Sequence, residues 1–352
     1  MSELLDYLQR AVELDASDIF IAPGTPLSVK LSGELQPLGT EKLMPNKTEE
    51  MIREIYSMAK RSAEQYLEDG DDDFSFAVPG IARFRVNMYR QRGSISTVIR
   101  VVKFTIPDWQ KLRIPKGVIE LSNQKHGMIL VTGTAGSGKS TTQACIVNEI
   151  NRTRACHIIT LEDPVEFLHR NQKSIVSQRE IAIDTESSLT GLRACLRQAP
   201  DVIQLGELRD LETIRTAMTA AETGHLLLAT LHTRGAVNTV DRIVDTFPAD
   251  QQAQIRLQLS SVLQTVVSQQ LLPAKAGGRV AAFEIMHTNN VIRSMIRDCK
   301  TPQIDNAIAS GGAEGMISMD QAIFALYRDG TITAETAIAY CNNPEQMQRR
   351  IR

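Results

Sequence analysis

This sequence has few aromatic residues, no large excess of one charge and no long apolar run. Phe, Trp and Tyr make up 5% of the 352 residues, which argues against the aromatic platforms on which single-stranded nucleic acid stacks. The 39 basic and 41 acidic side chains leave a net charge of -2, so composition indicates no nucleic-acid or anionic-membrane partner. No apolar run approaches the roughly 20 residues of a membrane span. We therefore expect no nucleic acid among the partners.

Cysteines are few and scattered. There are five, with no C-x-x-C pair, which argues against a zinc site or a disulfide framework. The first residues have neither a basic start nor an apolar core, so no signal peptide is expected. A reduced, cytosolic protein is the simplest expectation. With 42% hydrophobic residues the chain can bury a full core, and its length suggests about two or three domains.

The stretch 133–141 has the spacing G-x-x-x-x-G-K-[ST] of a P-loop. An apolar run at 127–132 predicts a buried strand before it, and helical spacing follows over 141–150. A chance glycine turn would lack this context, in which free N–H groups and a positive helix end meet at one point and bind phosphate. Lys139 is expected on the β/γ-phosphates and Ser140 on Mg²⁺. The predicted nucleotide-binding residues are Gly133, Thr134, Ala135, Gly136, Ser137, Gly138, Lys139, Ser140 and Thr141.

An acidic stretch, 161–167, ends the next predicted strand, 157–161. Hydrolysis needs a group that orients or deprotonates the attacking water. Glu162 is the candidate for this base, with Asp163 and Glu166 as supporting candidates. Taken alone, the stretch is more simply an acidic helix start before a proline.

A second acidic position follows the predicted strand 201–205. Most P-loop enzymes place an Asp for Mg²⁺ at this strand end, but here Gly206 stands there with Glu207 beside it. Glu207 is the candidate for contact with the metal or its water shell, because ligands bind at this edge of an open α/β sheet. The alternative is a structural glutamate paired with Arg209.

Histidines and arginines complete the candidate set. His225 and His232 flank a predicted buried strand, 226–231, and His232 is placed to hydrogen-bond the γ-phosphate or a catalytic carboxylate, although a lone histidine is more often a core residue. At strand period, Arg83 and Arg85 share one face while Phe84 and Val86 pack on the other. Together with Arg100, these arginines are either a solvated strand face or groups supplied across a subunit interface to the phosphate.

The order of predicted elements divides the chain. Residues 1–103 indicate a small α+β domain, and 104–117, which contains two prolines, is expected to be a linker. From 118 to 352 strands alternate with helices, so an α/β domain with a mainly parallel sheet is expected. Helical patterns are expected to dominate after Pro248, beginning with one helix over 250–269.

Taken together, the motifs resemble the secretion-type hexameric ATPases, and within them the PilT/PilU family of type IV pilus retraction (twitching motility) ATPases. The matching segments are 133–141, 161–167, 205–210 and 223–233. Further similarity extends over almost the whole chain. The resemblance implies a PAS-like N-terminal domain, a RecA-like ATPase domain, ATP with Mg²⁺, and a homo-hexamer.

The family pattern also assigns roles. It implies that Glu162 is the catalytic glutamate, Glu207 the Walker B glutamate that also serves Mg²⁺, and His232 the His-box histidine, while Arg83, Arg85 and Arg100 lie in the region that supplies arginines. Closure of one domain on the other would drive the inner-membrane platform protein of the pilus. The motor would then be cytoplasmic and peripheral at the inner face of the cytoplasmic membrane.

Several positions depart from the family pattern. Thr134-Ala135 replaces a common Pro-Thr, and Gln198-Ala-Pro200 resembles the PilU branch. Val291-Ile-Arg-Ser294 stands where the retraction motif Ala-Ile-Arg-Asn is expected. These departures favour an accessory motor that works with a paralogous retraction ATPase. A nucleotide-binding scaffold with little turnover is a further alternative, and a DNA translocase is disfavoured by the balanced charge.

Overall fold

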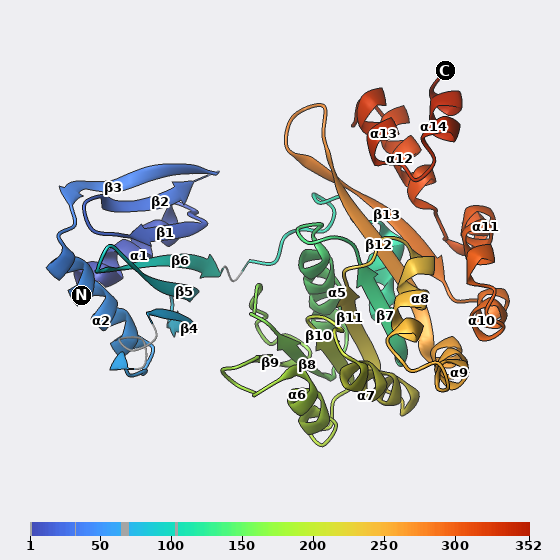
Figure 1. Cartoon of the computed structure of the whole chain (residues 1–352), viewed down its shortest axis with the longest axis horizontal. Helices are drawn as coiled ribbons and strands as arrows, with labels where there is room; N and C mark the ends of the chain where they lie inside the picture. Colours follow the sequence, from blue (N-terminus) through green and yellow to red (C-terminus); the bar gives the residue numbers. More distant parts are fainter. Residues whose placement is uncertain (1, 32, 65–69, 103–104) are drawn as a thin grey trace. The chain divides into compact units, whose positions relative to one another are not determined.

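The computed structural model describes the chain except for residues 1, 32, 65–69 and 103–104 (Figure 1). The chain divides into two compact units, Met1–Thr105 and Ile106–Arg352, and each is described by itself. Residues 103 and 104, at the expected domain boundary, lie outside the described residues. Most of the expected linker packs on the second unit, because Ile114 is buried in its core and Ile106 and Trp109 contact the same cluster.

The first unit is an antiparallel sheet with helices on one face. The described residues form six strands in the order β3-β2-β1-β6-β5-β4. Helix α1 (Glu3–Glu13) begins at Ser2, whose hydroxyl accepts from the Leu5 amide, and buries Leu4 and Leu8 against the sheet. Helix α2 (Pro45–Met58) contributes Ile52 and Ile55 to the same core. The strands are β1 (Asp18–Ile21), β2 (Pro26–Leu31), β3 (Glu34–Lys42), β4 (Asp71–Val78), β5 (Ala82–Gln91) and β6 (Ser94–Val102).

The second unit is built on a seven-stranded sheet of order β13-β12-β7-β11-β10-β8-β9 (Figure 1). All neighbouring pairs are parallel except β12 with β13. This mainly parallel sheet is the one expected from the alternating pattern. Its strands are β7 (Gly127–Thr132), β8 (His157–Glu162), β9 (Ile175–Glu180), β10 (Val202–Leu205), β11 (Leu226–Leu231), β12 (Leu263–Pro273) and β13 (Arg279–His287).

Helices cover both faces of this sheet. Alternate residues of each central strand pack on opposite sides: Ile158 and Val202 meet α5, whereas Ile159 and Ile203 join the cluster on the other face. Burial on both faces explains the continuous apolar runs in the sequence. The helices are α4 (Lys116–Ile119), α5 (Lys139–Thr153), α6 (Ser188–Cys195), α7 (Leu211–Glu222), α8 (Ala236–Asp245), α9 (Gln252–Val262), α10 (Asn290–Arg297), α11 (Ile304–Ser310), α12 (Met319–Arg328), α13 (Ala334–Tyr340) and α14 (Pro344–Ile351), with short 3-10 helices at Glu120–Asn123, Thr301–Gln303 and Gly311–Glu314.

The expected helix over 250–269 is wrong from residue 263 on. Helix α9 ends at Val262, and β12 begins at Leu263. The run misleads because Leu259, Val262 and Val266 are buried at a spacing that also fits a helix. Pairing with β7 and β13 satisfies the backbone from Leu263 on, and such non-local pairing is invisible in a local pattern.

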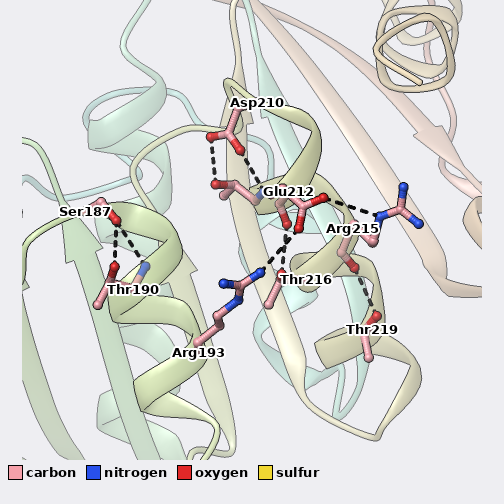
Figure 2. Close-up of polar contacts among 9 residues, drawn as sticks. Ser187, Thr190, Arg193, Asp210, Glu212, Arg215, Thr216 and Thr219 are labelled. Atoms are coloured by element: carbon pink, nitrogen blue, oxygen red, sulfur yellow. Dashed lines mark hydrogen bonds and ion pairs between the residues drawn. The ribbon is translucent and has the colours of Figure 1, made fainter. Parts of the chain in front are cut away.

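Helices α6 and α7 contact each other, and each begins at a side-chain cap (Figure 2). Ser187 accepts from the Thr190 amide at the start of α6. Asp210 accepts from the Thr213 amide at 2.9 Å and so caps α7. Arg193 of α6 reaches Glu212 of α7 at 3.3 Å. These contacts cap the two helices and link α6 to α7.

Across the described residues, no helix combines the length and the apolar character needed to span a bilayer.

Candidate active site

The predicted P-loop joins β7 to α5. Gly138, at the N-terminus of α5, has φ 89° and Gly133 has φ 143°, which glycine adopts at little cost. A Cβ on Gly133 would lie 2.3 Å from the Gln269 carbonyl oxygen, and one on Gly138 would lie 2.8 Å from Gln269 Nε2. The loop therefore needs glycine for its backbone and for the close approach of β12. The strand–turn–helix context predicted for residues 133–141 is present.

Lys139 lies inside the loop. Its ammonium donates to the carbonyl oxygens of Gly133 at 2.9 Å and Thr134 at 3.0 Å, and it lies 3.4 Å from His232 Nδ1. Burial lowers the pKa of Lys139, although the charges of Glu207 and Glu166 oppose this shift. The ammonium is thus held at the mouth of the loop, ready to exchange carbonyl oxygens for phosphate oxygens.

His232 connects this lysine to Glu207. Its Nε2 lies 2.9 Å from Glu207 Oε2. A charged lysine only donates, so Nδ1 accepts from Lys139 and Nε2 carries the proton that is donated to Glu207. Glu207 also forms an ion pair with Arg209. The structure therefore contains the Glu207–Arg209 ion pair of the structural interpretation. It also connects Glu207 to the P-loop lysine through His232.

Glu162 ends β8 and is 9% exposed. Its Oε1 accepts from the Thr160 hydroxyl at 2.6 Å and from Gln178 Nε2 at 3.2 Å. Burial raises the pKa of Glu162, opposed by these hydrogen bonds. A raised pKa favours proton acceptance from water, because a general base works best when its pKa lies near the working pH.

These side chains meet in one cavity of about 310 Å³. The strand order explains the convergence. Strands β8, β10, β11 and β7 lie next to one another in this order and are all parallel, so their carboxyl ends meet at one edge of the sheet. The Ser140 hydroxyl donates to Glu166 at 3.1 Å within it. Its lining includes Ala135, Gly136, Lys139, Ser140, Gln143, Glu162, Asp163, Glu166, Gln204, Gly206, Glu207, Arg209, Thr230 and His232.

The donor set of the cavity fits a hard divalent cation. The cavity is lined by the Ser140 hydroxyl and by the carboxylates of Glu162, Asp163, Glu166, Glu207 and Asp210, and oxygen ligands of this kind suit Mg²⁺. Lys139 and Arg209 are the basic side chains among its described lining residues. A triphosphate entering beside these five carboxylates would meet strong like-charge repulsion unless a cation accompanied it.

Comparison with known proteins identifies the family. Residues 2–311 match the family model "Type II/IV secretion system protein". The chain belongs to the type II/IV secretion system protein family. It is 41% identical to the type IV pilus retraction ATPase PilT of Pseudomonas aeruginosa, over 97% of this chain and 99% of the relative. It is 36% identical to the type IV pilus ATPase PilU of the same organism, over 98% and 90%.

A solved structure agrees with this assignment. The crystal structure of the pilus retraction motor PilT with bound ADP superposes with a TM-score of 0.90 at 44% identity, covering 99% of both chains. The predicted fold class, the resemblance to the PilT/PilU family and the ATPase activity are confirmed by these relatives.

A second cavity adjoins the P-loop, apart from the phosphate cavity described above. It has a volume of about 560 Å³ and is reached past Gly138, Thr141 and Thr142. Its walls are largely apolar, with Leu112, Ile114, Leu271, Val280 and Phe283 among them. Arg113, at its rim, donates to the Thr331 hydroxyl at 2.7 Å and lies 3.5 Å from Asp329. Sequence reasoning did not find this cavity, because its walls come from distant segments.

The three candidate arginines lie in the first unit. Arg83 and Arg85 occupy β5 on the face opposite the buried Phe84 and Val86. Arg85 pairs in register with Arg100 of β6. Each of these two contacts an aspartate, Asp73 at 2.6 Å for Arg85 and Asp18 at 3.1 Å for Arg100. The arginines therefore share one face of the first unit, whereas Lys139, Glu162, Glu207 and His232 belong to the second unit.

Three glutamines near the cavity escaped the sequence analysis. Gln178 holds Glu162, but it lies on β9, which was not predicted as a strand. Gln143 and Gln204 line the phosphate cavity from α5 and β10. A polar residue within the apolar run 202–205 was a usable signal for Gln204. No comparable local signal marks Gln143 or Gln178.

Proposed function

We propose that this chain is an ATP-hydrolysing motor that drives type IV pilus retraction. The observation that carries this proposal is the placement of the buried base candidate Glu162 and the P-loop Lys139 on one cavity. The relatives PilT and PilU are pilus ATPases that match nearly the full chain. A Ser, Cys or His nucleophile is not required, because phosphoryl transfer to water depends mainly on positioning and electrostatics.

Each residue of the cavity has a distinct task. Backbone N–H groups of residues 133–139 and the N-terminus of α5 bind the phosphates. Lys139 moves its hydrogen bonds from loop carbonyls to phosphate oxygens, and Glu162 accepts a proton from the attacking water. His232 contacts both Lys139 and Glu207, so it transmits the state of the phosphate site to Glu207.

Mg²⁺ is the cation that the oxygen-rich cavity would bind. Ser140 would hold it, with Glu207 or Glu166 on the metal or its waters. When bound, the cation neutralises charge on the phosphates. The Ser140–Glu166 hydrogen bond keeps the hydroxyl directed into the cavity.

The apolar cavity beside the P-loop would take the nucleoside. It is contiguous with Gly138, Thr141 and Thr142, so a nucleotide whose phosphates lie on the loop can place its base there. Leu112, Ile114 and Phe283 supply apolar contact area, and nucleotide bases bind well to such surfaces.

The assembly proposed for this ATPase is a homo-hexamer that acts on the inner-membrane platform protein of the pilus. It would be cytoplasmic and peripheral at the inner face of the cytoplasmic membrane, without a nucleic-acid partner. Residues 1–103 would form the PAS-like domain, 118–352 the RecA-like domain and 104–117 the connection. Arg83, Arg85 and Arg100 would reach the nucleotide as the two domains close. The second candidate is an accessory subunit of a paralogous retraction ATPase, favoured by Val291–Ser294.

Steady-state ATPase measurements on the purified ring test the proposal. Turnover should depend on Mg²⁺ and disappear in Lys139→Ala and in Glu162→Ala. Lys139→Ala should also weaken nucleotide binding, whereas Glu162→Ala should retain it. Normal turnover in either variant would refute the assignment. Nucleotide binding without turnover in the wild type would move the assignment to the accessory subunit.

A further inference from the structure

Two buried glutamines lie at the inner wall of the phosphate cavity without a role in the site described so far. Gln143 is on α5, three residues after Ser140 and four after Lys139, so it shares their helix face. Gln204 is on β10 and pairs in register with Thr160 and Leu228. The two side chains are 1% and 5% exposed, and both residues line the cavity.

Each glutamine has a fully buried amide atom that the described part of the chain leaves without a hydrogen-bond partner. These atoms are Gln143 Nε2, a donor, and Gln204 Oε1, an acceptor. The Thr160 hydroxyl, next to Gln204 in the sheet, does not donate to Gln204 Oε1, because it donates to Glu162. Buried polar atoms without partners destabilise a fold, so a pair of them at the wall of a binding cavity points to a ligand.

The position of Gln204 suggests which ligand this is. Along β10, Gly206 follows Gln204 by two residues, so it lies on the same face of the strand and nearer the cavity edge. Most P-loop enzymes carry at this strand end an aspartate that serves Mg²⁺. Gly206 has no side chain to offer, and the polar group next in line on that face is the Gln204 amide.

We propose that Gln143 and Gln204 hold the ligand shell of the divalent cation at Ser140, its waters and its anionic oxygens, in place of the missing aspartate. A water on a cation has its lone pair committed to the metal and therefore donates, which matches the Gln204 Oε1 acceptor. The Gln143 Nε2 donor matches an anionic oxygen of the same shell. This assignment rests on the proposed ATPase function and adds two positioning residues to its site.

The test uses Gln143→Met and Gln204→Met in the full chain, because methionine has nearly the length of glutamine and lacks its amide. Binding of a fluorescent ADP is titrated against Mg²⁺, and the melting temperature is measured without nucleotide. Each variant should melt at the same or a higher temperature, since it removes an unpaired polar atom. The Mg²⁺ concentration for half-maximal binding should rise roughly tenfold, as for other residues that orient a metal's ligands.

Thr288→Val is the matched control. Thr288 is 7% exposed, and its hydroxyl is another buried atom without a partner among the described residues. It follows β13 and does not line the phosphate cavity. This variant should not lower the melting temperature, and its Mg²⁺ dependence should match the wild type.

Unchanged Mg²⁺ dependence in both glutamine variants would overturn the inference, and a lower melting temperature beside it would leave the glutamines a structural role. If either methionine variant fails to fold, the shorter amides Gln143→Asn and Gln204→Asn replace it under the same criteria. Failure of the proposed function is separately visible, because the wild type itself would then show no Mg²⁺-dependent ADP binding.

Discussion

Replacing Gln269 should loosen the P-loop without touching any residue of the loop. Gln269 lies on β12 and is 3% exposed. Its Oε1 accepts from the Thr142 hydroxyl at 2.7 Å, and its Nε2 donates to the Ser137 carbonyl at 2.6 Å. One side chain thus fastens both the loop and the first turn of α5 to β12, the second strand from one edge of the sheet.

The magnitude follows from the two bonds. In Gln269→Leu the Ser137 carbonyl and the Thr142 hydroxyl lose these partners inside the protein, and each such loss costs about 1–3 kcal/mol. At the low end the total is about 2 kcal/mol. For a domain of this size class, 1 kcal/mol shifts the melting temperature by about 2–4 °C. The variant should therefore melt roughly 4–8 °C below the wild type, and it should bind ADP more weakly because the loop is less well ordered.

Differential scanning calorimetry with and without ADP measures both effects. The matched control is Gln270→Leu, because Gln270 is the next residue on the same strand and is only half-buried. Such a position tolerates substitution within about 0.5 kcal/mol. A wild-type melting temperature and ADP affinity in Gln269→Leu would refute the clamp.

Three further predictions concern residues of the two units. Glu162→Gln should abolish turnover, keep ADP binding and raise the free energy of unfolding at pH 7. The reason is that burial raises the folded-state pKa of Glu162 above its usual value of 4.5. The wild-type protein therefore loses stability as the pH rises from 4.5 through the folded-state pKa, and the glutamine variant does not. A variant that is less stable than the wild type in urea unfolding at pH 7 would contradict this. Arg113→Ala should weaken ADP binding severalfold in a fluorescence titration, because it removes the hydrogen bond from Arg113 to Thr331 at the rim of the apolar cavity. Equal ADP affinity would exclude that cavity as the nucleoside site. Arg85→Ala breaks a partly exposed pair with Asp73, so stability should change by less than about 1 kcal/mol while ATP hydrolysis falls. Unchanged hydrolysis would leave Arg85 on a solvated strand face.

Much of the fold was predictable because local signals and tertiary structure agree. The strand before Gly133 and the helix after Lys139 are both present. The expectation that strand ends would gather Glu162 and Glu207 also held, since it requires only that the strands be parallel and adjacent. Periodicity sufficed to place Arg83 and Arg85 on one face.

The remaining features depend on pairings between distant segments. Gln269 reaches Thr142 across 127 positions of sequence, and it lies in a stretch whose pattern fits a helix equally well. The His232–Lys139 contact spans 93 positions and follows from the neighbouring register of β11 and β7. No local pattern encodes such a register, so the sequence indicated the chemistry of the site but not the side chains that hold it in position.

The question of an independent or accessory motor turns on a different part of the second unit. In α10, where the retraction motif is altered, Ile292 and Ile296 are buried and Arg293 donates to the Ser261 carbonyl at 2.8 Å. The helix therefore keeps its attachment to the core. Val291 is 56% exposed, so its change from the family's alanine alters the surface and leaves the phosphate cavity intact. We therefore expect the isolated chain to hydrolyse ATP, and we expect any accessory character to arise from what the surface of α10 binds.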